Sequence, residues 1–217
     1  MKLVVFDVDG TLIDSQALIV GAMEAAFETA GLPAPTRDQI LSIVGLSLPV
    51  AMARLAPEAP ETRIATLVEG YKQAFMTRRV SSEAPLYPGA RDCLEALSLR
   101  DDLLLGVATG KSRRGLDAML DHHGLRGFFV TLQTADNHPS KPHPEMLLSA
   151  CSGAGMDPAH TVMIGDTDYD IDMARAAGTA AIGVAWGYHP AEALRAAGAP
   201  IAADFIALRA LIEEWSA

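Results

Sequence analysis

Short apolar segments alternate with segments of helical periodicity along most of this 217-residue chain, and this alternation limits its fold more than any other feature. The apolar segments are mostly continuous, as in parallel strands that are buried on both faces. Strands that alternate with helices form parallel sheets with right-handed crossovers. We therefore predict an α/β fold with a doubly wound parallel sheet. The expected strands are residues 3–8, 103–108, 128–132, 161–164 and 180–184, and the expected helices are residues 90–99, 113–122, 145–154 and 169–177.

One long region contains no strand-like segment. Between about residues 16 and 82 the apolar residues recur only at helical spacing, and turns rich in Gly and Pro separate the helical parts. Thr36 and Gln39 have the spacing of a capping box at a helix start. We therefore predict an all-helical insertion, residues 15–81, in a core domain made of residues 1–14 and 82–217. Its apolar stripe consists of Ile64, Leu67, Val68, Tyr71 and Phe75.

Charge and hydropathy argue against two classes of partner. The chain has 17 basic and 27 acidic residues and a formal net charge of −10, whereas nucleic-acid binding depends on a surplus of Lys and Arg. The longest uncharged segments, residues 40–53 and 176–191, fall short of the roughly 18 apolar residues that a membrane-spanning helix needs. We expect a cytoplasmic protein that binds neither nucleic acid nor a membrane. Whether it is a monomer or a homodimer stays open.

Polar side chains stand where several of the predicted strands end. Asp7 and Asp9 follow the first strand, Thr109 follows the second, and Asp166 follows the fourth. Lys141 lies in a loop before a predicted helix. Ligands of open α/β sheets bind beyond the carboxyl ends of the strands, so we expect these side chains to meet. Each motif alone is typical of a turn or a helix start, and only their occurrence together at one sheet edge indicates a function.

Clustered carboxylates of this kind suit phosphoryl transfer. They repel one another and therefore require a divalent cation, and an all-oxygen set without paired His or Cys favours Mg²⁺ over zinc. One carboxylate can attack phosphorus, and a second, two residues further along, can protonate the leaving oxygen and then deprotonate water. Lys141 and the hydroxyl of Thr109 would neutralise the phosphoryl oxygens.

Together, these motifs resemble the four motifs of the haloacid dehalogenase superfamily, in the expected order and spacing. They are Asp7-Val-Asp-Gly-Thr11, Thr109, Lys141 and Gly165-Asp-Thr-Asp-Tyr-Asp170. The resemblance covers essentially the whole chain, and the segments around Lys141, Asp166 and Gly183 are similar to those of the phosphoglycolate phosphatase-like branch. It implies a Rossmann-like core with a helical cap between the first and second motifs, where we predict the helical insertion.

The resemblance also implies a role for each motif residue. Asp7 would be the nucleophile and a Mg²⁺ ligand, and Asp9 would be the general acid and base, with its backbone carbonyl reaching the metal. Asp166 would complete the metal site, and Asp170 would support it, directly or through water. The other catalytic, phosphate-binding or substrate-binding positions are Thr109, Lys141, Gly10, Gly110 and, in the cap, Gly45, Leu46 and Ser47.

The function implied by the resemblance is that of a Mg²⁺-dependent phosphatase. It would hydrolyse a small phosphorylated metabolite through an aspartyl-phosphate intermediate, with 2-phosphoglycolate as the nominal substrate. No basic residue stands next to Gly45 to receive the carboxylate of that substrate. The candidates for this role are Arg54, Lys72, Arg78 and Arg79, but the favoured interpretation of each is a solvated helix face.

Other functions share parts of this motif set. Asp9 argues against a haloacid dehalogenase, which lacks this second Asp, and the absence of Lys from residues 45–54 argues against a phosphonoacetaldehyde hydrolase. A β-phosphoglucomutase-like phosphosugar mutase shares all four motifs, but its cap presents Arg and Lys where this segment is rich in Leu and Ser. An inorganic pyrophosphatase of the same superfamily and a non-enzymatic phosphate-binding protein are the remaining alternatives.

Overall fold

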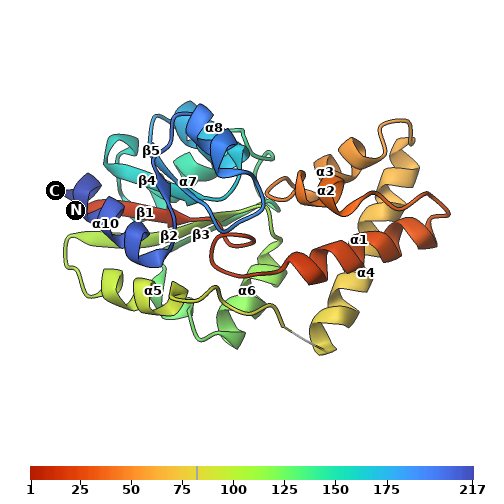
Figure 1. The fold of residues 1–217 in the computed structure, drawn as a ribbon, viewed down its shortest axis with the longest axis horizontal. Coiled ribbons are helices and arrows are strands. Elements are labelled where there is room, and N and C mark those ends of the chain that lie inside the picture. The colour runs from red at the N-terminus through yellow and green to blue at the C-terminus, as the bar shows by residue number, and fades with distance from the viewer. Residues whose placement is uncertain (82) are drawn as a thin grey trace.

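The computed structural model describes residues 1–81 and 83–217, which form a parallel sheet covered by helices and a helical module at one end (Figure 1). The six strands are β1 (Lys2–Phe6), β2 (Leu103–Thr109), β3 (Thr131–Thr134), β4 (Thr161–Gly165), β5 (Ala180–Val184) and β6 (Ile201–Ala202). Their order across the sheet is β3-β2-β1-β4-β5-β6, and all pairings are parallel. The predicted doubly wound α/β fold is confirmed.

Both faces of the sheet are buried in its central strands, which explains why β1, β2 and β4 are mostly continuously apolar, whereas the edge strand β3 (Thr-Leu-Gln-Thr) is not. In β1, Val4 and Phe6 belong to one core cluster, whereas Leu3 and Val5 belong to the cluster on the opposite face. The first cluster includes residues of α5 (Ala90–Ser98), α6 (Arg113–His122) and α10 (Phe205–Ser216). The second includes residues of α7 (Glu145–Ala154) and α8 (Asp168–Ala177), while α9 (Ala191–Ala196) packs beside β5 and β6.

The helical insertion folds around an apolar core of its own. It comprises α1 (Gln16–Thr29), α2 (Arg37–Leu41), α3 (Leu48–Leu55) and α4 (Glu61–Ser81). The helices α1 and α4 pack along each other, and the predicted stripe of α4 faces this core with Leu67 fully buried. The predicted capping box of Thr36 and Gln39 is present at the start of α2. Within the described part of the chain, no helix is both long and apolar enough to cross a membrane.

The helical insertion lies beyond the carboxyl ends of the strands, at the opposite end of the molecule from both termini (Figure 1). The chain enters and leaves it through adjacent segments: the N–H of Asp14 donates to the carbonyl of Pro85 (2.9 Å), and that of Tyr87 donates to the carbonyl of Leu12 (3.0 Å). We propose that residues 15–81 form a cap domain joined to the core by this paired connection. Ser82, the first residue of the predicted returning core segment, lies outside the described residues.

The third strand differs from its predicted position. The expected strand at residues 128–132 is wrong at its start, because Arg126–Phe128 forms a short 3₁₀ helix and β3 spans Thr131–Thr134. Phe128 and Phe129 pack against the core cluster from this turn, so their apolar character reflects burial rather than strand structure. The sequence analysis also does not predict α9, α10 or β6; β6 has two residues, too few for a periodic pattern.

Candidate active site

One edge of the sheet brings four of the predicted residues into a buried cluster. Asp7 follows β1, Asp166 follows β4, and Asp170 lies in the first turn of α8. Lys141 joins them from the loop between β3 and α7 and is 1% exposed. Because β1 pairs in parallel with β4, and Phe6 lies opposite Ile164, the residues that follow the two strands meet. The convergence expected from the sequence is therefore present.

Three of these residues form a group that fits a divalent cation. Carboxylate oxygens of Asp7, Asp166 and Asp170 lie within 4.8 Å of one another, and Oδ2 of Asp7 is buried without a hydrogen-bond partner among the described residues. Burial raises the pKa of Asp7 to about 6, an effect that Lys141 opposes and Asp170 reinforces. Burial, together with the charges of Asp7 and Asp170, also raises the pKa of Asp166 well above its ordinary value. This all-oxygen, negatively charged set suits a hard cation such as Mg²⁺.

Lys141 supplies a positive charge inside the cluster. Its Nζ donates to Oδ1 of Asp7 at 2.9 Å and to Oδ1 of Asp170 at 2.6 Å. Burial alone would lower the pKa of Lys141, but Asp170 and Asp7 raise it above its ordinary value, so the ammonium group stays charged. Three carboxylates thus share one ammonium group, and negative charge remains for a cation to neutralise.

Asp170 is the most fully hydrogen-bonded of the three carboxylates. Its Oδ1 accepts from Lys141, and its Oδ2 accepts from both the Oγ1 (2.7 Å) and the backbone N–H (3.2 Å) of Thr167. These contacts with Thr167 form a capping box at the start of α8. Oδ2 of Asp7, by contrast, has no such partner in the part of the chain that the structure describes. The hydrogen bonding therefore favours a supporting role for Asp170 beside a cation and a direct one for Asp7.

Asp166 is held by hydrogen bonds and by close glycine backbones. Oγ1 of Thr11 donates to its Oδ1, and the N–H of Tyr188 donates to its Oδ2, both at 2.9 Å. A Cβ on Gly10 would lie 2.2 Å from the nearest Asp166 atom, and a Cβ on Gly187 would lie 2.1 Å from it. Gly10 also has a φ of +87°, in the left-handed region. Gly10 is thus required by backbone conformation and by the packing of Asp166.

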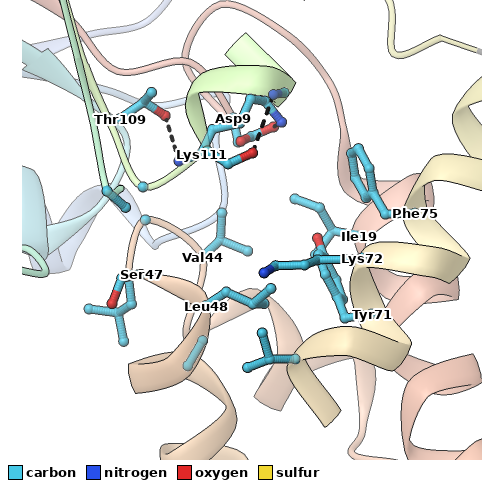
Figure 2. Close-up of a pocket in the computed structure, with 18 of the residues that line it drawn as sticks. Asp9, Ile19, Val44, Ser47, Leu48, Tyr71, Lys72, Phe75, Thr109 and Lys111 are labelled. Atoms are coloured by element: carbon cyan, nitrogen blue, oxygen red, sulfur yellow. Dashed lines mark hydrogen bonds and ion pairs between the residues drawn. The ribbon is translucent and has the colours of Figure 1, made fainter. Parts of the chain in front are cut away.

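Asp9 lines the cavity next to this cluster (Figure 2). Its Oδ1 accepts from Oγ of Ser15 at 2.6 Å and pairs with Nζ of Lys111 at 3.0 Å. Because Ser15 is the first residue of the helical insertion, its hydrogen bond connects Asp9 to the start of that insertion. The hydroxyl of Tyr188 lies 3.0 Å from that of Ser15 and extends this connection. A carboxylate that borders this acidic cluster and faces a cavity is suited to proton transfer at a leaving group.

Lys111 is a site residue to which the sequence analysis assigns no role. Besides its ion pair with Asp9, its Nζ lies 5.1 Å from the centre of the Phe75 ring in α4, so it contacts both the core and the helical insertion. Its backbone N–H donates to Oγ1 of Thr109, which is buried, at 3.2 Å. Lys111 stands two residues after Thr109, at the same sheet edge, and this position could have identified it as a site residue from the sequence.

The predicted cap segment reaches the core at the entrance of the site. The residues that line the cavity here are Gly45, Leu46 and Ser47 from the helical insertion and Thr109 and Gly110 from the core. The N–H of Ser47 donates to Oγ of Ser140 at 2.8 Å, next to Lys141 in the chain. A Cβ on Gly110 would lie 2.5 Å from the carbonyl oxygen of Gly45, so the two backbones are in close contact.

Replacing Gly110 with alanine is expected to lower kcat/KM by about 10-fold to 100-fold, because displacement of the cap segment by as little as ~1 Å misplaces the substrate. The atoms that its Cβ would meet, carbonyl oxygens of Gly45 and Leu46, are backbone and cannot rotate away. Gly127→Ala is the matched control, since its Cβ would have no neighbour within 4 Å. Steady-state kinetics of the two variants are the measurement, and equal values of kcat/KM would contradict a close backbone contact at this place.

The fold and the site together define a class of protein. A doubly wound sheet, a buried acidic cluster at its carboxyl edge and a helical insertion above it are the parts of a hydrolase that works on phosphorylated substrates. A family model described as haloacid dehalogenase-like hydrolase matches residues 4–184. The chain belongs to this family, as its motifs predict.

Named relatives agree with this assignment. The chain is 40% identical over 207 residues to "Probable phosphatase IndB" of Dickeya dadantii, and this match covers 93% of the chain and 89% of the relative. It is 35% identical over 201 residues to the phosphoglycolate phosphatase of Chromobacterium violaceum, covering 90% of each. A solved structure of a hydrolase from Pseudomonas syringae matches 99% of both chains with a TM-score of 0.88 and 26% identity. The predicted enzyme class, a phosphatase, is confirmed.

Proposed function

We propose that this phosphatase is a Mg²⁺-dependent phosphomonoesterase that transfers the phosphoryl group of its substrate to Asp7. The observation that carries the proposal is the buried cluster of Asp7, Asp166 and Asp170, in which Oδ2 of Asp7 has no hydrogen-bond partner among the described residues. Asp7 and Asp166, supported by Asp170 and the backbone carbonyl of Asp9, would hold the cation. When bound, Mg²⁺ neutralises the acidic cluster and polarises the phosphoryl oxygens.

The side chains of the chain supply the bond-making steps. A carboxylate oxygen of Asp7 attacks phosphorus, the bond from phosphorus to the leaving oxygen breaks, and Asp9 gives that oxygen a proton. Lys141 and Thr109 stabilise the charge on the phosphoryl oxygens. Asp9, now ionised, takes a proton from a water that attacks the aspartyl phosphate. Inorganic phosphate then leaves, and Asp7 is restored as a carboxylate.

The proposed substrate is a small phosphorylated metabolite. The name of the relative in Chromobacterium violaceum makes 2-phosphoglycolate the nominal substrate to test first. Three alternatives predict different products: a phosphosugar mutase isomerises glucose 1-phosphate without net phosphate release, an inorganic pyrophosphatase prefers pyrophosphate, and a phosphate-binding protein releases nothing. A phosphate-release assay over phosphomonoesters, pyrophosphate and sugar phosphates separates them. We expect phosphomonoesters to be hydrolysed most efficiently.

Removal of divalent cations tests the metal part of the proposal. Treatment with EDTA is expected to reduce phosphate release to background, because the uncompensated carboxylates then repel the anionic substrate, and added Mg²⁺ restores it. Mg²⁺ should also raise the Tm of the EDTA-treated protein, since a cation that binds the folded acidic cluster stabilises the fold. Full activity in EDTA together with an unchanged Tm on adding Mg²⁺ would contradict a cation at this cluster.

A further inference from the structure

A cavity of about 540 Å³ lies between the catalytic side chains of the core and the helical insertion (Figure 2). Asp7, Asp9 and Thr109 line its core side. Ligand pockets for molecules larger than a few atoms have volumes of roughly 300–1,000 Å³. A two-carbon leaving group such as glycolate would therefore leave much of this space unfilled. The cavity has room for a larger leaving group.

The wall that faces the catalytic residues is apolar and partly aromatic. Ile19 and Val44 are buried members of the apolar core of the helical insertion, and Tyr71 and Phe75 pack against that core from α4. The rings of Tyr71 and Phe75 stack with centroids 5.7 Å apart. Apolar walls of this kind contribute binding free energy to an apolar ligand, whereas the hydroxyl groups of a sugar that lay against them would lose water to apolar side chains. The wall therefore favours an apolar leaving group.

Lys72, an exposed residue of α4, also lines this cavity. Figure 2 shows its side chain extending from α4 across the cavity, with the ammonium group on the side of Val44 and Leu48. Among the described residues, no carboxylate lies within ion-pair distance of Lys72. Of the other cations of the lining, Lys111 pairs with Asp9 at 3.0 Å and Arg79 pairs with Glu83 at 3.7 Å. Arg114, on the core side of the cavity, has no ion pair among the described residues either, so it is the cation against which the role of Lys72 has to be tested. Lys72 is thus available to a ligand.

We propose that the physiological substrate is a phosphomonoester whose leaving group has an apolar, ring-sized body and carries a carboxylate, and that Lys72 binds this carboxylate. The apolar body would lie against Val44, Leu48 and the Tyr71 and Phe75 rings. That the substrate is a phosphomonoester rests on the proposed function, whereas the binding of a carboxylate by Lys72 does not. The sequence analysis interprets Lys72 as part of a solvated helix face; we now interpret it as a ligand-binding residue.

Matched esters test the substrate class. Benzyl phosphate has the apolar body alone, 4-(phosphonooxymethyl)benzoate adds the carboxylate, and 2-phosphoglycolate has the carboxylate without the apolar body. We expect kcat/KM for the carboxylated benzyl ester to exceed that for benzyl phosphate by about 10-fold to 100-fold, the range typical of a hydrogen bond to a charged group. 2-Phosphoglycolate should be the poorest of the three. The proposal would be overturned if kcat/KM for 2-phosphoglycolate exceeded that for at least one of the two benzyl esters.

Lys72→Met tests the residue, because methionine keeps the unbranched, apolar stem and removes the charge. The variant is expected to lose the preference for the carboxylated ester mainly through KM, since Lys72 does not touch the reacting atoms. Its turnover of benzyl phosphate should change less than 3-fold, well below the charge-assisted effect. Arg114→Met removes an equal charge from the core side of the same cavity and should keep the preference. Loss of the preference in Arg114→Met, with retention in Lys72→Met, would overturn the assignment of Lys72.

A binding measurement separates this inference from the proposed function. Calorimetric titration of EDTA-treated protein with 4-(hydroxymethyl)benzoate needs no catalysis, and benzyl alcohol is the uncharged comparison. The acid is expected to bind about 10-fold or more tightly than the alcohol to the wild type and equally weakly to Lys72→Met. Equal affinities of the wild type and the variant for the acid would overturn the inference. Failure of all esters to release phosphate, with the Lys72-dependent titration intact, would instead contradict only the proposed function.

Discussion

Asp7→Asn is expected to abolish phosphate release, with a loss in kcat on the order of 10⁴-fold or more, because the amide cannot attack phosphorus. The substitution keeps the size of the side chain and the position of the atom that faces Lys141. Phosphate release under single-turnover conditions is the measurement, together with mass spectrometry of the acid-quenched enzyme for a phosphoryl group on the peptide that contains Asp7. The wild type should carry this group, and the variant should not.

The same substitution is expected to stabilise the metal-free protein. In the folded state the pKa of Asp7 is about 6, above its ordinary value of 3.8, so the folded protein binds more protons than the unfolded chain between these values. Stability therefore falls as the pH rises through this window, and the penalty is fully present above about pH 6. Asparagine carries no charge to desolvate. At pH 8 in EDTA, Asp7→Asn should raise the free energy of unfolding by up to about 3 kcal/mol.

Asp172→Asn is the matched control for both measurements. Asp172 lies on the exposed side of α8, where it pairs with Arg175 at 3.0 Å, and surface pairs of this kind contribute little to stability. The control should keep both the activity and the Tm of the wild type. Retained phosphate release in Asp7→Asn would show that the nucleophile lies elsewhere. A lower Tm of Asp7→Asn at pH 8 in EDTA would show that the charge of Asp7 stabilises the fold.

Lys141→Met is expected to destabilise the protein by about 3–5 kcal/mol at pH 8, because it removes one partner of a buried ion pair and leaves the other charges uncompensated. The distances of 2.9 Å to Asp7 and 2.6 Å to Asp170 place the lost charge inside the acidic cluster. Activity should fall by at least 10²-fold to 10³-fold, since in the proposed mechanism the ammonium group also stabilises the charge of the transferring phosphoryl group. Denaturant unfolding and steady-state kinetics are the two measurements.

The pH dependence distinguishes this electrostatic loss from simple loss of packing. Without the ammonium group, the pKa of Asp7, which burial already raises, rises further above its ordinary value. The extra destabilisation is then complete above this pKa and diminishes as the pH falls and Asp7 becomes protonated. Lys141→Met should therefore recover stability relative to the wild type between pH 8 and pH 5. A constant difference across this range would indicate a packing defect. Arg195→Met, which removes an equal charge from the exposed surface of α9, should show little effect at either pH.

The sequence was sufficient to predict the sheet because the signal for buried parallel strands is local. Leu3 and Val5 face one core and Val4 and Phe6 face the other, so the four buried positions of β1 all have to be apolar. The same reasoning fails at residues 128–132, where Phe128 and Phe129 are apolar because they pack from a turn. An apolar segment reports burial, and burial implies a strand only where the backbone also pairs.

The sequence by itself determined the acidic cluster of the site. Parallel strands bring their carboxyl ends to one edge, so the sequence places Asp7 and Asp166 at that edge, and the adjacency of β1 and β4 then brings the two side chains together. Only the tertiary structure decided what surrounds that cluster. Lys72 and Lys111 stand far apart in the chain, and their approach to one cavity depends on how the helical insertion lies over the sheet. The physical reason is that strand pairing repeats along the chain and therefore produces a periodic pattern of apolar residues in the sequence. A side-chain contact between the core and the helical insertion, which pack separately, produces no such pattern in the sequence of either part.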